Sequence, residues 1–121
     1  MHILMEVHRE NSSMVVLVDI DGMVITFLNP QNSMYSWDLK AYPKDFIDAS
    51  KKSDEPEFDC EDFTICTNHR IYFYGNFEKS ENAEFVNLDF TKFADPPSMR
   101  ITLRKSEVAK LVQILEDYFT C

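Results

Sequence analysis

The clearest hydrophobic periodicity lies near the C-terminal end of the chain. Between residues 107 and 119, large apolar side chains recur three and four positions apart, at Val108, Leu111, Val112, Leu115, Tyr118 and Phe119. This spacing places them on one side of an α-helix. Ser106 precedes them, and its hydroxyl can accept a hydrogen bond from a free backbone N–H and begin the helix. We therefore predict an amphipathic helix over residues 107–119 that packs on a sheet.

Most of the preceding chain has the two-residue alternation or the short apolar runs of β-strands. Separated by polar turn residues, these segments predict strands near 2–8, 14–20, 23–28, 33–39, 62–67, 70–77, 84–90 and 99–103. Short turns such as Asp21-Gly22 join them, so the sheet should be largely antiparallel. A short helix is predicted near 43–51, with Pro43 in its first turn and Phe46 and Ile47 facing inward. Together these elements predict a single α+β domain over residues 1–121.

Acidic side chains are concentrated in the middle of the chain. The protein has 21 acidic and 12 basic side chains, and residues 45–95 contain thirteen of the former and five of the latter. Nucleic-acid binding requires Lys and Arg to neutralise phosphates, so this balance disfavours a DNA or RNA partner. The small basic cluster Arg100, Arg104 and Lys105 leaves single-stranded nucleic acid open as an alternative.

The N-terminus and the cysteines favour a cytoplasmic protein. The segment MHILMEVHRE lacks the basic and apolar regions of a signal peptide, and no stretch approaches the ~20 apolar residues of a membrane span. Three cysteines, Cys60, Cys66 and Cys121, fit free thiols in a reducing compartment better than a disulfide framework. A Cys60–Cys66 bridge stays open as an alternative. We expect no membrane association.

The segment VVLVDIDGMVITF resembles the opening motif of haloacid-dehalogenase-type phosphatases. The resemblance implies a nucleophilic carboxylate at Asp19, an acid/base at Asp21 and a Mg²⁺ ion. The usual Thr of that motif is Met23 here, and the alternating strands and helices of its parallel sheet are missing. We interpret the segment as a β-hairpin, with a small metal-dependent phosphatase as an alternative.

No other pattern predicts a catalytic centre, a metal site or a cofactor. His2, Glu6 and His8 share one side of the predicted first strand, but positions four apart on a strand are separated by about 13 Å. The chain has no CxxC pair and no GxSxG nucleophile motif. Acidic neighbours raise the pKa of a thiol, which disfavours Cys60 and Cys66 as nucleophiles. We therefore expect a binding protein and not an enzyme.

The candidate binding site is the segment SDEPEFDCEDF, residues 53–63. It contains no basic residue and six carboxylates: Asp54, Glu55, Glu57, Asp59, Glu61 and Asp62. The apolar residues Phe58 and Phe63 and the thiol of Cys60 interrupt it, so part of it should be held against the domain. Where the segment is extended, Glu57, Asp59 and Glu61 would project together.

Such a patch attracts a basic partner and can raise its association rate to as much as ~10⁹ M⁻¹s⁻¹. Aromatic side chains beside it would slow dissociation, because Tyr and Trp are frequent binding hot spots. Trp37 and Tyr72 are the candidate anchors. Core packing is the competing interpretation of both aromatic side chains.

A small acidic domain with a concentrated acidic patch and no catalytic set resembles the bacterial immunity proteins of colicin and contact-dependent growth inhibition systems. The resemblance is to a physical type, represented here by residues 54–62, and not to a shared motif. It implies a one-to-one complex that neutralises a cognate protein toxin, often a basic nuclease. The alternative is an inhibitor that mimics nucleic acid and uses the same carboxylates against another target.

Overall fold

The computed structural model describes residues 2–8, 13–19, 24–28, 38–66, 73–92 and 97–119, which form two antiparallel sheets and two helices. The strands of the first sheet are β1 (His2–His8), β2 (Ser13–Asp19), β3 (Val24–Leu28), β4 (Asp38–Ala41) and β6 (Ile65–Cys66). Those of the second are β5 (Cys60–Phe63), β7 (Phe73–Lys79), β8 (Phe85–Lys92) and β9 (Pro97–Arg104). The helices are α1 (Pro43–Lys52) and α2 (Lys105–Phe119).

The chain passes from the second sheet to the first between β5 and β6, which follow one another along the chain and pair with different strands. The order is β1-β2-β3-β4-β6 in the first sheet and β5-β7-β8-β9 in the second, and every recorded strand pair is antiparallel. The predicted single strand over 62–67 is therefore two short strands, because the chain changes sheet at Thr64. The predicted α+β class and antiparallel pairing are confirmed.

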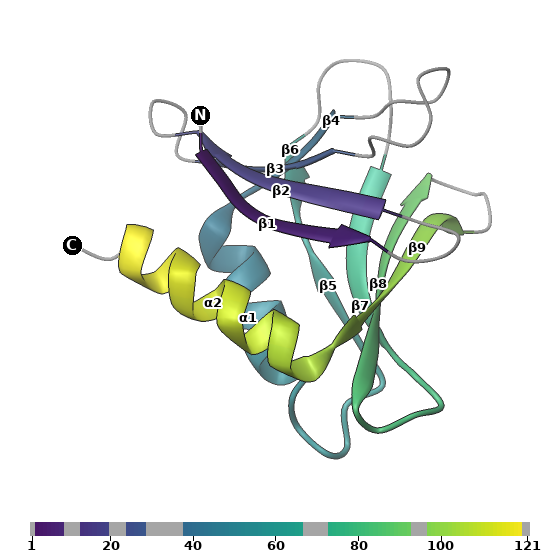
Figure 1. Ribbon diagram of the computed structural model, residues 1–121. Helices are drawn as coiled ribbons and strands as arrows, with labels where there is room; N and C mark the ends of the chain where they lie inside the picture. Colours follow the sequence, from purple (N-terminus) through teal and green to yellow (C-terminus); the bar gives the residue numbers. More distant parts are fainter. Residues whose placement is uncertain are drawn as a thin grey trace.

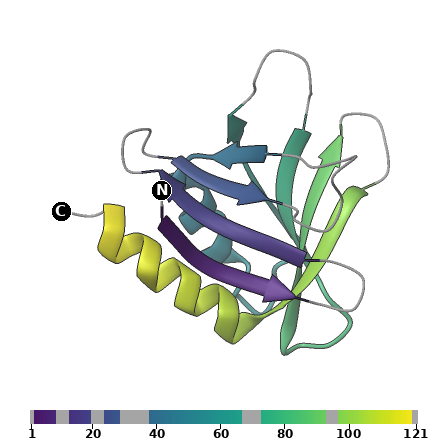
Figure 2. The ribbon, with the colours of Figure 1, turned by 45° about the horizontal axis from the view of Figure 1, so that its top comes forward.

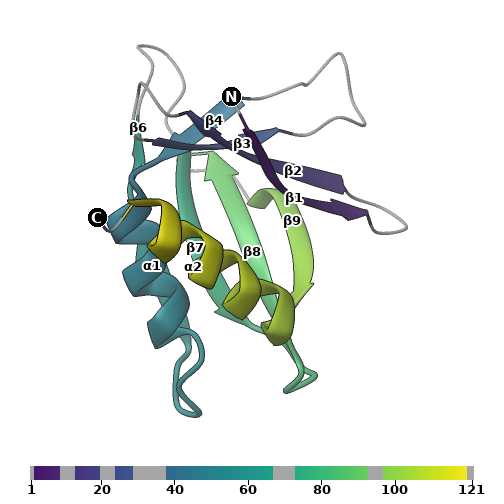
Figure 3. The same ribbon diagram turned by 60° about the vertical axis from the view of Figure 1, so that its left-hand side comes forward.

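Both helices lie in the space between the two sheets (Figure 1). The five-stranded sheet crosses the top of the molecule, and α2 runs beside its edge strand β1 (Figure 2). Helices α1 and α2 are neighbours on the same side of the four-stranded sheet (Figure 3). The helices thus cover the concave side of the sheets, where the core forms.

Five phenylalanine rings form the centre of that core: Phe27, Phe46, Phe63, Phe77 and Phe90. Their ring centroids approach to 5.1 Å, both between Phe27 and Phe90 and between Phe46 and Phe63. Aromatic pairs at this spacing gain stability beyond the area they bury.

The alternation of β8 is confirmed, because Val86, Leu88 and Phe90 are all buried on the core side. Helix α1 also matches its prediction closely, and Phe46 is fully buried on it. Neither α1 nor α2, the helices of the described residues, is long and apolar enough to cross a bilayer.

The start of helix α2 differs from its prediction, whereas its last residue, Phe119, agrees with it. The helix begins at Lys105, so the predicted N-cap Ser106 lies inside the first turn and is exposed. The Glu107 carboxylate instead reaches back and accepts a hydrogen bond from the Arg104 N–H, at 2.8 Å. At the other end Tyr118 is 36 % exposed, because the last turn of α2 extends beyond the sheet (Figures 1 and 2).

Candidate functional site

The acidic segment forms an ordered loop between α1 and β5. The Phe58 N–H donates to the Glu55 carbonyl at 3.2 Å and closes a turn, and the Lys79 N–H donates to the Asp59 carbonyl at 3.1 Å. The Phe58 side chain is only 8 % exposed and belongs to the core. The expectation that part of the segment 53–63 is held against the domain is therefore confirmed.

Strand β5 is anchored by Phe63 at its other end. The Phe63 ring is buried and packs edge-on against Phe46, with 5.1 Å between centroids, and lies 5.6 Å from Phe77. Because β5 is the outermost strand of its sheet, this ring fixes the position of the acidic side chains on the strand.

The six carboxylates of the segment do not share one face. Five of them are exposed and Glu61 is half-buried. Glu57 lies in the turn that Phe58 closes, so the expected grouping of Glu57 with Asp59 and Glu61 on an extended face is wrong for Glu57. Glu61 and Asp62 are adjacent on β5, so their side chains lie on opposite faces of the strand. The Asp62 carboxylate is 3.7 Å from the Cys60 sulfur.

Helix α1 adds two carboxylates that the sequence interpretation did not include in the site. Asp45 and Asp48 line a mostly polar groove of about 220 Å³ between α1 and β5, together with Glu61 and Asp62. Lys52 is the basic residue in this groove. The sequence feature that could have pointed to Asp45 and Asp48 is their spacing, because residues three apart lie on one side of a helix.

We use the name acidic edge for the eight carboxylates of α1, the following loop and β5: Asp45, Asp48, Asp54, Glu55, Glu57, Asp59, Glu61 and Asp62. The other aromatic candidates, Trp37 and Tyr72, lie outside the described residues. Tyr74, which has the same strand parity as Tyr72, is 43 % exposed on β7, as expected for the less buried face.

Cys60 is a free cysteine, so the alternative Cys60–Cys66 disulfide is not formed. Its thiol donates a weak hydrogen bond to Asp62, and its sulfur accepts one from the Asn76 amide at 3.0 Å. Partial burial of the sulfur and the nearby carboxylates of Asp62 and Glu78 raise the pKa of the Cys60 thiol. A protonated thiol is a poor nucleophile.

The basic cluster predicted from the sequence is largely engaged within the protein. Arg100 donates to both carboxylate oxygens of Asp89, at 2.7 and 2.9 Å, and to Glu78 at 2.6 Å. Asp89 is only 1 % exposed. Its hydrogen bonds raise the pKa of the Arg100 guanidinium, and a hydrogen bond to Asp89 also raises the pKa of Glu78.

The other two members of that cluster lie near aromatic rings. The Arg104 guanidinium is 6.0 Å from the ring centroid of Phe85, and the Lys105 amine is 5.9 Å from that of Phe58. The three cations do not form one concentrated phosphate-binding surface, because the guanidinium of Arg100 already donates its hydrogen bonds to the carboxylates of Asp89 and Glu78.

The segment that resembles a phosphatase motif has antiparallel neighbours. Strand β2 lies between β1 and β3, and Asp19 is paired with Val24 across the β2–β3 hairpin. This antiparallel pairing agrees with the interpretation of the segment as a β-hairpin. It differs from the parallel sheet that the resemblance to the phosphatases implies. Asp21 lies outside the described residues. Among those residues, no group of three His, Cys, Asp or Glu side chains is arranged to hold a metal ion.

Comparison of the chain with protein-family models, with curated proteins and with solved structures gives no match.

Proposed function

We propose that this protein is an immunity protein, which binds a basic, nuclease-type toxin through its acidic edge and neutralises it in the cytoplasm. The observation that supports the proposal most is that a helix, an ordered loop and a strand that follow one another along the chain present these eight carboxylates. The loop and strand that present six of them are fixed by the buried rings of Phe58 and Phe63. The surface is therefore preorganised, which lowers the entropic cost of binding.

Electrostatics favours a basic protein as the partner. The chain has a formal net charge of −9. A nuclease has a basic surface because it must bind phosphates, and a fixed array of carboxylates is complementary to such a surface. A charge-steered complex forms quickly, which suits a protein that must intercept a toxin before it damages the cell.

An inhibitor that mimics nucleic acid would use the same acidic edge against a different target. Direct nucleic-acid binding has less support, since Arg100 is held by Asp89 and Glu78. The phosphatase alternative has less support as well, since Asp19 lies on an antiparallel hairpin. The proposal therefore concerns binding and not chemistry.

The test is capture of the partner with three versions of the tagged protein. The first is the unchanged chain. The second has Glu57→Lys and Asp59→Lys, which reverse two exposed charges of the acidic edge. The third has Glu6→Lys and Asp117→Lys, which change the net charge equally on β1 and α2. Proteins captured from lysate of the source organism are identified by mass spectrometry and then assayed for nuclease activity.

We expect a basic protein in one-to-one amount with the unchanged chain and with the Glu6/Asp117 variant, and its loss with the Glu57/Asp59 variant. Adding the unchanged chain in equimolar amount should abolish the activity of the captured protein. Equal capture by both variants would remove the acidic edge from the proposal. A captured enzyme that remains fully active in the complex would refute neutralisation.

A further inference from the structure

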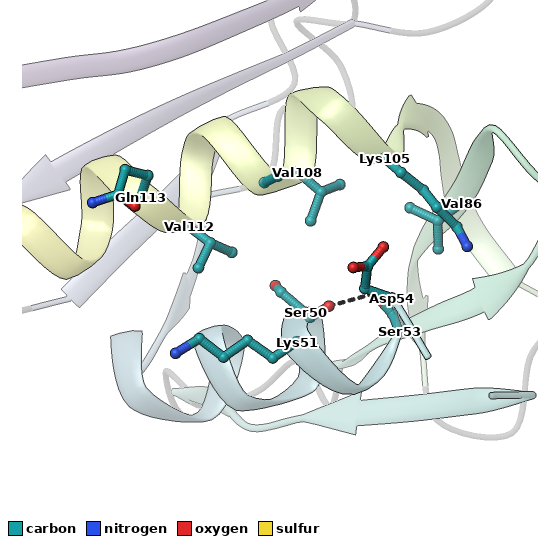
Figure 4. A pocket seen from close by; sticks show the side chains of 10 residues that line it. Ser50, Lys51, Ser53, Asp54, Val86, Lys105, Val108, Val112 and Gln113 are labelled. Atoms are coloured by element: carbon teal, nitrogen blue, oxygen red, sulfur yellow. Dashed lines mark hydrogen bonds between the residues drawn. The ribbon is translucent and has the colours of Figure 1, made fainter. Parts of the chain in front are cut away.

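The end of the molecule that carries the acidic loop also has an apolar groove between α1 and α2 (Figure 4). Its floor is formed by Val86 of β8 and by Val108 and Val112 of α2, all buried. The volume of this α1–α2 groove is about 160 Å³. An apolar cavity of about 150 Å³ can hold one benzene molecule. The groove therefore has room for a single aromatic ring or branched aliphatic side chain.

Most polar groups around the α1–α2 groove already have partners. The Ser50 hydroxyl donates to the Phe46 carbonyl and the Ser53 hydroxyl donates to the Ser50 carbonyl, each at 2.7 Å. The Lys51 amine forms an ion pair with Glu116 at 2.6 Å. The two serine hydroxyls therefore have no hydrogen left to donate to a ligand. The positive charge of Lys51 is already neutralised by Glu116.

Asp54 is the exception at the mouth of the groove. It is exposed, and its carboxylate points from the end of α1 toward α2 (Figure 4). Among the described residues no ion pair is recorded for it. Lys105 also lines the groove, but it extends past Val86 and its amine lies 5.9 Å from the centroid of the Phe58 ring. The apolar floor is thus bordered by an accessible negative charge.

A second hollow adjoins the first on the other side of Asp54. It has a volume of about 270 Å³, is mostly apolar, and shares Asp54 and Lys105 with the α1–α2 groove. Its lining also includes the rings of Phe58 and Phe85 and two residues of opposite charge, Glu55 and Lys79. Apolar surface therefore flanks Asp54 on both sides and is continuous with the acidic edge.

We infer that the α1–α2 groove is the anchor site for the basic partner: it receives one Phe or Leu side chain of that partner, while an adjacent Lys or Arg pairs with Asp54. The inference rests on the proposed function, because the occupant is the same basic protein. Binding hot spots combine a buried apolar anchor with surrounding polar contacts. The groove supplies the pocket for such an anchor, and Asp54 selects a cationic neighbour.

The first test needs only the purified protein and two small probes. We would titrate 2-phenylethylammonium and phenylacetate, which pair the same ring with opposite charges, and follow the valine methyl signals by NMR. The ammonium probe should shift the methyls of Val86, Val108 and Val112 in a saturable way, with a Kd on the order of millimolar for a ligand of this size. Asp54→Asn should weaken it about two- to fivefold and should not weaken phenylacetate.

Two bulky substitutions on the outer side of α2 serve as a matched pair. Ala109 is exposed and lines the groove, whereas Lys110 is exposed beside it and does not. Ala109→Trp should fill the groove and abolish the methyl shifts, and Lys110→Trp should leave them unchanged. Absence of saturable shifts in the unchanged protein, or tighter binding of phenylacetate, would overturn the inference.

The captured partner separates this inference from the proposed function. We expect Ala109→Trp to weaken the complex at least tenfold and Lys110→Trp to leave it unaltered. If Ala109→Trp has no effect while Glu57→Lys with Asp59→Lys abolishes binding, the anchor site is wrong and the acidic edge stands. If neither set of changes weakens binding, the proposed function fails as well.

Discussion

The ring of Phe63 lies against Gly75, the residue that faces it across the β5–β7 ladder. A Cβ atom on Gly75 would overlap the far end of that ring, and Gly75 itself is buried. The ring has nowhere to move, because Phe46 and Phe77 pack against it. The absence of a side chain at Gly75 is thus what lets Phe63 anchor β5 and the acidic residues on it.

We predict that Gly75→Ala destabilises the protein by about 1–3 kcal/mol, as overpacking a core does. This sign is the opposite of the usual effect, since Gly→Ala inside a strand normally improves stability. The measurement is the free energy of unfolding in urea. In a Phe63→Leu background the same substitution should cost clearly less. An equal cost in both backgrounds would show that the ring is not the cause.

The secondary structure was predictable wherever apolar side chains recur with the period of one face of a strand or a helix. On β8 the apolar residues Val86, Leu88 and Phe90 enter the core, whereas the polar residues between them, Asn87 and Asp89, lie on the other face, where they are also buried and are hydrogen-bonded by Thr102 and Arg100. Helix α1 was predictable from Pro43 and from the buried Phe46. In each case the information lies within about ten consecutive residues.

Features that depend on distant partners were not predictable from the same patterns. The break at Thr64 arises because β5 pairs with β7 while β6 pairs with β4, and neither pairing is encoded locally. The addition of Asp45 and Asp48 to the site likewise requires that α1 lie beside β5. The helix start was missed because Ser106 and Glu107 can both cap a helix, and in the structure the Glu107 carboxylate accepts the hydrogen bond from the Arg104 N–H.

Arg100 should contribute to stability and not to nucleic-acid binding. Arg100→Ala leaves the Asp89 carboxylate buried without its cation, and we expect a loss of about 3 kcal/mol in the free energy of unfolding. Arg104→Ala, the matched control on the same strand, should change stability by less than about 0.5 kcal/mol. Adding Asp89→Asn to Arg100→Ala should restore part of the loss, because a neutral amide needs no counter-charge. No recovery would mean that the ion pair is not the reason.

The Glu78 carboxyl should make stability depend on pH. Its pKa is raised in the folded protein, first by the hydrogen bond with Asp89 and then by burial. The stability associated with this raised pKa is present below the unfolded value of about 4.3 and is lost as pH rises through the folded pKa. Glu78→Gln removes this dependence, so the variant should gain stability relative to the unchanged protein as pH rises from about 4 to 7.

The size of that gain should be below about 1 kcal/mol, because the Glu78 side chain is 44 % exposed and solvent screens its charge. Urea unfolding at several pH values measures it. Glu81→Gln, an exposed residue in the turn after β7, controls for the loss of one negative charge. A Glu78→Gln difference that is constant with pH, or that falls as pH rises, would contradict the assignment.

Asp48 should accelerate binding of the basic partner, if the partner is steered by the whole acidic edge and not by the loop alone. Asp48 is exposed in the second turn of α1 and lines the groove beside Glu61, so Asp48→Lys changes the edge without disturbing the core. At low ionic strength we expect the association rate constant to fall about two- to tenfold. Glu6→Lys reverses the same charge on β1, at the far edge of the other sheet, and should have a smaller effect.

Ionic strength provides the decisive comparison for Asp48. The Debye length falls from about 30 Å at 0.01 M to about 3 Å at 1 M, so steering is largely lost at the higher value. The association rates of Asp48→Lys and of the unchanged protein should therefore converge in stopped-flow measurements at high salt. A difference that persists at 1 M would indicate a direct contact between Asp48 and the partner. Equal rates at low salt would limit the functional surface to the loop and β5.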